Sequence, residues 1–246
     1  MRRTCSAGAA SVLLLLTGVG SASAASADHQ SVLDRVGTRI AVESAVEAGY
    51  TARLVGRGSP IRVVATVTVP TLACGSEDAG VVTSVGVVEM PYRFAGGQIH
   101  ARCAGGEATY GARLETSSGT GEEIDGVVEA GDRIKITAEW NGSVGRPEVE
   151  VEMTSVDRGW QESTQFEFIA DGFNGAVFRQ IPMWVDGTKL GLADYADARV
   201  QQARVDREAL GDVRRTRFVL VDADGDRLVV PSRIRAGRAF DFSYVG

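Results

Sequence analysis

The fold of this chain is decided by residues 131–168, which read GDRIKITAEWNGSVGRPEVEVEMTSVDRGWQESTQFEF. Apolar and polar side chains alternate there in three successive runs, separated by turn-rich segments at Asn141–Pro147 and Ser155–Gly159. Because successive side chains of a β-strand point to opposite faces of the sheet, a period of two predicts three antiparallel strands with one apolar and one polar face. The stretch therefore predicts a β-meander over a core, and the remaining chain is expected to supply the sheet that packs against it.

Several other segments are rich in β-branched residues and bounded by glycine, proline or polar turns, which predicts further strands. They are Ile61–Val69, Gly80–Glu89, Gln98–Cys103, Tyr110–Glu115, Ala176–Val185, Arg217–Val221, Arg227–Val230 and Ala239–Val245. Gly96-Gly97 is expected to break the chain before Gln98, and Pro182 predicts an edge strand or a bulge because proline cannot donate to a sheet ladder. The composition of Leu190–Leu210 favours a helix, whereas its neighbours favour strand and loop. Since no repeat or low-complexity linker divides the chain, the predicted fold class is all-β, a single-domain, two-sheet antiparallel β-sandwich.

The N-terminus carries a targeting pattern rather than a part of this fold. Two arginines precede the apolar run Val12–Val19, and small residues typical of a cleavage site follow it. The run is too short to span a bilayer and is typical of a secretory signal peptide, predicted at residues 1–27. Residues 28–48 have a loose helical pattern and are expected to form an N-terminal arm or a short helix, which leaves residues 49–246 for the sandwich. We therefore expect a secreted protein.

Charge and composition narrow the range of partners and cofactors. The formal net charge is −6, so the chain lacks the basic surface that attracts nucleic acids or anionic lipids, and we expect neither a nucleic acid nor a membrane as partner. Beyond the signal peptide Cys74 and Cys103 are the only cysteines, and in an oxidising compartment such a pair predicts one disulfide. His29 and His100 are too few for a typical imidazole metal site, so no metal or cofactor is expected. We expect a monomer.

The acidic segment Asp222–Asp226 has two interpretations. Its aspartates follow the spacing of a calcium-binding loop, but Arg227 and Arg233 stand where an EF-hand has its glycine and its bidentate glutamate. The alternative is a hairpin turn, because Asp-Gly is a frequent turn dipeptide and apolar runs lie on both sides. The turn is the favoured interpretation.

Short signatures along the chain, taken in order, resemble one family of enzymes. They are Gly49-Tyr50, Thr66–Cys74, Val85-Gly86-Val87, Gly131–Ile134, Gly159-Trp160 and Leu192–Tyr195. Over roughly Tyr50 to Val245 the chain resembles the eqolisins, the secreted glutamic peptidases. The resemblance implies a concanavalin-like β-sandwich and an endopeptidase that acts at acid pH.

Eqolisin chemistry requires a glutamate as general base and a glutamine that holds the attacking water and stabilises the oxyanion, with a tryptophan beside them. The resemblance puts Gln98 at the glutamine position, fourteen residues after the tryptophan position, which holds Ser84. A second register would put Cys103 on the glutamine, but it loses the cysteine match. Val177 stands at the position of the glutamate and cannot accept a proton. The resemblance is therefore to a divergent member without its catalytic glutamate.

Two hypotheses follow from these departures. The first is a non-catalytic secreted module that binds a peptide, a glycan or a protein in the groove of the former active site. The second is a divergent acid endopeptidase in which Gln98 works with another carboxylate, such as Glu115 or Glu89. A carboxylate within hydrogen-bond reach of Gln98, directly or through one water, would favour the second hypothesis.

Overall fold

The computed structural model describes residues 31–32, 41–54, 60–89, 93–142, 147–168 and 172–246, and the predicted signal peptide lies outside them. The described residues form strands and no helix. In particular, they contain no helix long and apolar enough to cross a membrane. The strands build two layers, and we call them the first layer and the second layer.

The first layer contains seven strands in hydrogen-bonded order. They are β9 (Gly121–Glu123), β8 (Glu107–Thr116), β7 (Arg93–Ala104), β6 (Ala79–Glu89), β13 (Gly175–Pro182), β3 (Ala48–Arg53) and β19 (Arg215–Val221). All of these neighbours are antiparallel. β19 also pairs with β20 (Arg227–Pro231) and, in parallel, with β2 (Ala41–Ser44), which pairs with β1 (Ser31–Val32).

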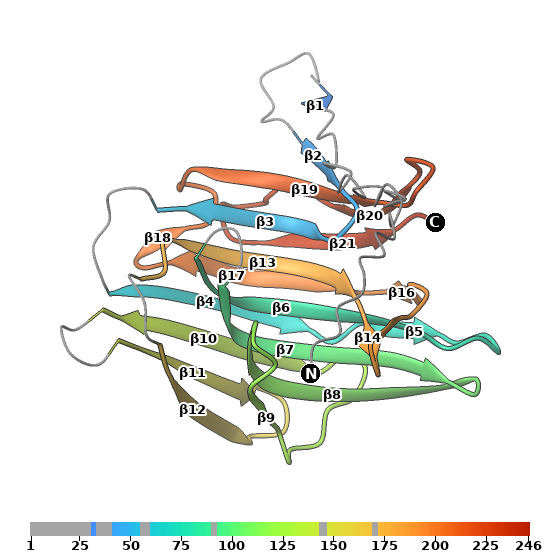
Figure 1. Cartoon of the computed structure of the whole chain (residues 1–246), viewed down its shortest axis with the longest axis horizontal. Coiled ribbons are helices and arrows are strands. Elements are labelled where there is room, and N and C mark those ends of the chain that lie inside the picture. The colour runs from blue at the N-terminus through green and yellow to red at the C-terminus, as the bar shows by residue number, and fades with distance from the viewer. Residues whose placement is uncertain (1–30, 33–40, 55–59, 90–92, 143–146, 169–171) are drawn as a thin grey trace, which may run out of the picture.

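The second layer contains the meander and the strands that extend it. Their order is β12 (Gln161–Glu167), β11 (Glu148–Ser155), β10 (Arg133–Asn141), β4 (Ile61–Thr68), β17 (Arg199–Val205) and β18 (Glu208–Ala209). β21 (Phe240–Tyr244) pairs with both β20 and β17, so the two layers join into one 17-stranded sheet that curls on itself (Figure 1). Two short pairs lie outside that sheet, β14 (Trp184–Val185) with β15 (Thr188–Lys189) and β5 (Thr71–Ala73) with β16 (Asp194–Ala196).

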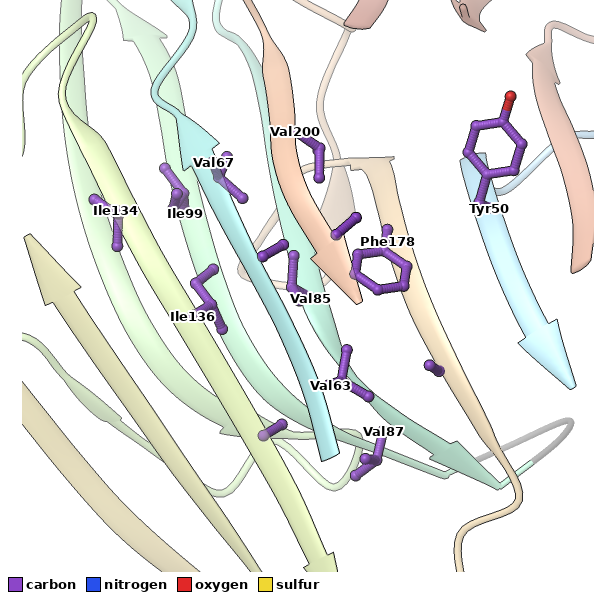
Figure 2. Close-up of a cluster of buried hydrophobic side chains, with 14 of the residues drawn as sticks. Tyr50, Val63, Val67, Val85, Val87, Ile99, Ile134, Ile136, Phe178 and Val200 are labelled. Carbon is purple, nitrogen blue, oxygen red and sulfur yellow. The ribbon is translucent and has the colours of Figure 1, made fainter. Parts of the chain in front are cut away.

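One hydrophobic core lies between the two layers. Figure 2 shows side chains from both layers directed into it, among them Ile136 of β10, Val63 of β4, Ile99 of β7 and Phe178 of β13. Phe178 is fully buried, and burying a side chain of this kind contributes about 1.5–3 kcal/mol. The core explains the alternation seen in the sequence, because each meander strand turns its apolar residues toward the first layer and its polar residues toward water.

The fold class and the meander are confirmed. β10, β11 and β12 follow one another antiparallel, with Ile136 opposite Met153 and Val151 opposite Thr164. The meander does not lie at the centre of its layer, because β12 forms one end of it and β4 adds to the free side of β10. The similarity of β4 to β10 in length and apolar pattern makes that pairing favourable.

The prediction that Gly96-Gly97 breaks the chain was wrong, because β7 continues through both glycines. A Cβ atom on Gly97 would lie 2.7 Å from Ile136 Cγ2, a side chain of the second layer. A Cβ atom on Gly96 would lie 2.2 Å from the carbonyl oxygen of Val85 in the neighbouring strand and 2.9 Å from the ring of Phe94. The two glycines are therefore needed for close packing on the two faces of the strand rather than for a turn.

The prediction that Pro182 marks an edge strand or a bulge was also wrong, because β13 pairs with β6 in an unbroken register as far as Pro182. β13 lies between β3 and β6, and Pro182 is its last residue. The pairing with β3 has already ended at Gln180, so the missing N–H of the proline removes no ladder bond on that side. The chain then leaves the layer and forms the separate hairpin of β14 and β15.

The helical alternatives were wrong for the described residues. Residues 28–48 supply β1, β2 and the start of β3 where they are described, and Leu190–Leu210 supplies β16, β17 and β18. In β17 the residues Val200, Ala203 and Val205 are buried against the core while the strand pairs with β4. Tertiary pairing with β4 thus outweighs the helical composition of this segment.

Two local predictions are confirmed. Cys74 and Cys103 form a disulfide with a Cα–Cα distance of 5.4 Å. Asp222–Asp226 forms the turn between β19 and β20, with the Asp222 N–H donating to the Asp226 carbonyl at 2.9 Å. The Asp222 carboxylate accepts from the N–H groups of Asp224 and Asp226, so it stabilises the turn. The described residues contain no cluster of His, Cys, Asp and Glu arranged to hold a metal ion.

Candidate functional site

The outer face of the first layer, which points away from the core, carries Gln98, Ser84, Val177 and Glu115. Glu89 instead has the parity of the core residues Val85 and Val87 and lies at the end of β6. Gln98 and Ser84 stand in one straight row with two arginines that the sequence did not single out. Across neighbouring strands, Arg113 of β8 lies opposite Gln98 of β7, Gln98 opposite Ser84 of β6, and Ser84 opposite Arg179 of β13. Directly opposite residues in an antiparallel pair have Cβ atoms about 4.5–5.5 Å apart. We call these four residues the Gln98 row.

Gln98 is held by a histidine. Its side chain is almost covered, with 9% of the residue exposed, and its Oε1 lies 3.0 Å from Nε2 of His100, two residues along the same strand and on the same face. No carboxylate of the described residues forms a hydrogen bond with Gln98. The geometry therefore brings Gln98 together with an imidazole rather than with the carboxylate that an eqolisin-type dyad requires.

Ser84 and Val177 are also covered. Ser84 is 0% exposed, and its Oγ has no hydrogen-bond partner among the described residues, an arrangement that costs about 1–3 kcal/mol when no other group satisfies it. Val177 lies opposite Gly86 and forms a small apolar cluster with Val88 and Phe94. The Phe94 ring covers Gly86, because a Cβ atom there would lie 2.8 Å from that ring. The position that resembles the catalytic glutamate is therefore apolar.

The two carboxylates considered as substitutes lie elsewhere. Glu115 is opposite Gly96, one row from Gln98, and its Oε2 lies 3.5 Å from Nε of Arg113. Burial raises the pKa of the Glu115 carboxyl, an effect that Arg113 partly opposes. Glu89 pairs with Arg93 at 2.9 Å, at the end of the β6–β7 hairpin. It is five residues beyond Ser84 on the same strand, or about 16 Å along an extended chain.

Besides Arg113, two residues of this face were missed as site residues in the sequence. Arg179 donates to the Glu47 carboxylate at 2.7 Å, and its guanidinium lies 5.4 Å from the centre of the Phe94 ring. His100 contacts Gln98, although the sequence analysis considered it only as a possible metal ligand. Burial lowers the pKa of His100, with Glu123 opposing this and Arg113 adding to it. Parity was the available signal, because both residues stand two positions after a residue already assigned to this face.

Comparison with known proteins gives a fold but no closer assignment. No protein-family model matches the chain, and no curated protein matches it. Among solved structures, scytalido-glutamic peptidase with a transition-state analogue inhibitor aligns with a TM-score of 0.63 and 17% identity, over 82% of this chain and 98% of that chain. Another is SCP-B, a member of the eqolisin family in complex with the tripeptide Ala-Ile-His, with a TM-score of 0.59 and 21% identity over 81% of this chain and 100% of that chain.

Aspergilloglutamic peptidase from Aspergillus niger aligns with a TM-score of 0.53 and 18% identity, over 69% of this chain and 99% of that chain. This chain therefore has the eqolisin type of β-sandwich, in a single domain. At this identity the likeness defines the fold, whereas function depends on the residues of the site itself.

Proposed function

We propose that this protein is a secreted, non-catalytic β-sandwich of eqolisin type that binds a peptide or protein segment across the outer face of the first layer, around Gln98. A glycan is the other ligand class that such a surface accommodates. The Cys74–Cys103 disulfide supports secretion, because disulfides form and persist in oxidising compartments, and so does the predicted signal peptide.

One observation carries the non-catalytic part of this proposal. Gln98 Oε1 pairs with His100, and the position that resembles the general base holds Val177 in an apolar cluster with Phe94. Water attack on an amide bond at acid pH needs a positioned proton acceptor, which contributes about 10²–10⁴-fold. A valine packed against a phenylalanine ring cannot supply it.

The binding part rests on the amide of Gln98. With Oε1 engaged by His100, the amide nitrogen makes no hydrogen bond within the described residues and can donate to a carbonyl of a ligand. A structurally similar protein, SCP-B, is known in complex with a tripeptide. A peptide is therefore the first ligand to test.

The test is a selection from a digest of denatured proteins. Immobilised mature protein should retain a subset of peptides at acid pH, and Gln98→Ala should weaken their affinity by about 1–3 kcal/mol if a buried partner is left unpaired. Mass spectrometry of the retained peptides should find only the termini present in the input digest. Retention of no peptide would contradict the peptide-binding proposal, and new termini generated by the protein would contradict its non-catalytic part.

A divergent acid endopeptidase is the second candidate, and the raised pKa of Glu115 is the observation that favours it. Carboxyls with raised pKa values are common among catalytic acids and bases. For such an enzyme Gln98→Ala or Glu115→Gln should greatly lower kcat with little change in KM. In a binding module, neither variant has any turnover to lose.

A further inference from the structure

The Gln98 row consists of hydrogen-bond donors. Figure 1 shows β8, β7, β6 and β13 side by side, and their register brings Arg113, Gln98, Ser84 and Arg179 into one line. The guanidinium groups only donate, and the amide of Gln98 has its acceptor oxygen engaged by His100. Two polar atoms of the row, Ser84 Oγ and Arg179 Nε, are buried with no hydrogen-bond partner among the described residues. Arg113 Nε also makes no hydrogen bond, although it lies 3.5 Å from Glu115 Oε2.

Both arginines of the row already pair with carboxylates of the protein. Arg179 donates to Glu47 at 2.7 Å, and Arg113 lies 3.5 Å from Glu115 and 3.6 Å from Glu123. Glu123 lies opposite Arg113 and so ends the row on β9, whereas Glu115 and Glu47 lie beside the row. The uncharged pair Gln98 and Ser84 remains between the two cations. The centre of the row thus has unsatisfied donors with a guanidinium on each side, an arrangement that matches a carboxylate better than an uncharged amide.

We propose that the Gln98 row binds a carboxylate of the ligand, an acidic side chain or a C-terminal carboxylate of a peptide, between Arg113 and Arg179. This inference rests on the proposed binding function and names its ligand class. A catalytic glutamate would place a carboxylate on the protein, whereas here cations and donors of the protein receive a carboxylate from the ligand.

The flanking carboxylates compete with the ligand for the same guanidinium groups. Glu47 occupies one edge of Arg179, and its side chain and that of Arg179 are both largely buried. Replacing Glu47 by glutamine removes that competitor and leaves a partly buried cation without its partner. Ligand binding should therefore become tighter in Glu47→Gln and weaker in Arg179→Gln. These opposite signs distinguish competition at the site from general damage to the layer.

The experiment compares three matched probes near pH 6, where free carboxyl groups are ionised. The probes are acetyl-Ala-Glu-Ala-amide, acetyl-Ala-Gln-Ala-amide and acetyl-Ala-Ala-Ala with a free C-terminus. Binding is followed by NMR through the side-chain amide signal of Gln98 and the Nε–H signals of Arg113 and Arg179. We expect a probe with a carboxylate to bind about tenfold or more tightly than the Gln probe, since hydrogen bonds to charged groups are stronger than neutral ones. Whichever carboxylate probe binds more tightly identifies the source of the group.

Single substitutions test which residues cause the preference for a carboxylate probe. Arg179→Gln should abolish the tenfold difference, and Ser84→Ala should reduce it. Arg199→Gln removes an exposed arginine that pairs with Asp241 on the second layer and should change nothing. Thermal unfolding of each variant checks that it is folded. If Arg179→Gln does not fold, Arg179→Lys keeps the charge but loses the two-pronged geometry, and it should retain only part of the preference.

Three results would overturn the inference. The first is equal binding of the Glu and Gln probes, and if Gln98→Ala weakened both, the proposed binding function would stand without its carboxylate specificity. The second is a carboxylate preference that persists in both Arg113→Gln and Arg179→Gln. The third is no shift of the Gln98 or arginine signals with any probe at about 10 mM, well above the concentration range of specific recognition.

Discussion

The outer faces of the two layers are built differently. On the second layer, polar side chains such as Glu150 and Gln165 lie opposite one another and stay in water. On the first layer, β6 and β7 are buried almost throughout, and even the polar Ser84 and Gln98 are covered. A solvated face needs only polar side chains, whereas a covered face needs a partner for each polar atom. The polar groups of the first layer are therefore the ones that point to function.

The largest expected difference in stability is between a substitution in the core and one on the solvated outer face of the second layer. Phe178→Ala empties a fully buried position between the layers and should lower the free energy of unfolding by about 3–5 kcal/mol. Glu150→Ala on the outer face of the second layer is the matched control and should change it by no more than about 0.5 kcal/mol. Urea unfolding measures both. Similar losses for the two variants would mean that the outer face of the second layer is not solvated.

Reducing the disulfide should increase local opening of strands more in the first layer than in the second. Cys74 and Cys103 connect the segment after β5 to β7, with 29 residues of separation. Reduction should lower the free energy of unfolding by about 2–5 kcal/mol, largely because the unfolded chain gains freedom. Hydrogen exchange should show faster opening of β6, β7 and β8 than of β10 and β11. Equal acceleration in both layers would contradict a local effect of the bond.

Two glycines on the outer face of the first layer differ in how closely other atoms pack around them. A Cβ atom on Gly86 would lie 2.3 Å from the carbonyl oxygen of Ala95, whereas a Cβ atom on Gly111 would meet nothing within 4 Å. Gly86→Ala should therefore destabilise the protein by about 1–3 kcal/mol through overpacking. Gly111→Ala should be close to neutral. Thermal and urea unfolding of the two variants provide the measurement, and a neutral Gly86→Ala would show that Phe94 does not pack as described.

The smallest expected effects are those of pH, and they have opposite signs in the two layers. Burial raises the pKa of Glu115, so its contribution favours the folded state below the ordinary carboxyl pKa and is lost as pH rises through the raised value. Hydrogen bonds from Arg133 lower the pKa of Asp157, so its contribution is present above the ordinary carboxyl pKa and is lost as pH falls through the lowered value.

Unfolding free energies measured from neutral pH to about pH 3, a range that includes the ordinary carboxyl pKa values, test whether the two contributions have opposite pH dependence. Glu115→Gln should be more stable than the parent at neutral pH, and the advantage should shrink in acid. Asp157→Asn should be less stable than the parent at neutral pH, and the deficit should shrink in acid. Shifts of the same sign for both variants would contradict the assigned environments.

The parts of the fold that sequence could predict are those with local causes. The meander follows from alternation, the turn at Asp222–Asp226 from its aspartates and glycine, and the disulfide from the cysteine count. The errors at Gly96-Gly97 and Pro182 have non-local causes. Gly97 is required by Ile136 and Met153 of the other layer, and the interior place of β13 depends on β3, which lies more than a hundred residues away in the chain.

In the candidate site, too, some features could be predicted from the sequence and others could not. The resemblance assigned Gln98, Ser84 and Val177 to family positions, and the register places these three residues on the adjacent strands β7, β6 and β13. The partners of these residues could not be predicted, because the contact of Gln98 with His100 and the position of Arg179 beside Glu47 depend on side-chain directions and on strand neighbours. Once β6, β7 and β13 are known to be adjacent, parity alone assigns both residues to the site face.

The most direct measurement is an acid proteolysis assay on the purified protein, with denatured protein as substrate, pepstatin present and mass spectrometry of the products. Because Val177 is packed in an apolar cluster and no described carboxylate contacts Gln98, we expect no cleavage at a rate resembling that of an eqolisin. Introducing the eqolisin residues in a Val177→Glu, Ser84→Trp double variant tests the same assignment in the opposite direction, and gained proteolysis would support it. Pepstatin-insensitive cleavage by the parent protein, abolished by Gln98→Ala, would contradict the account.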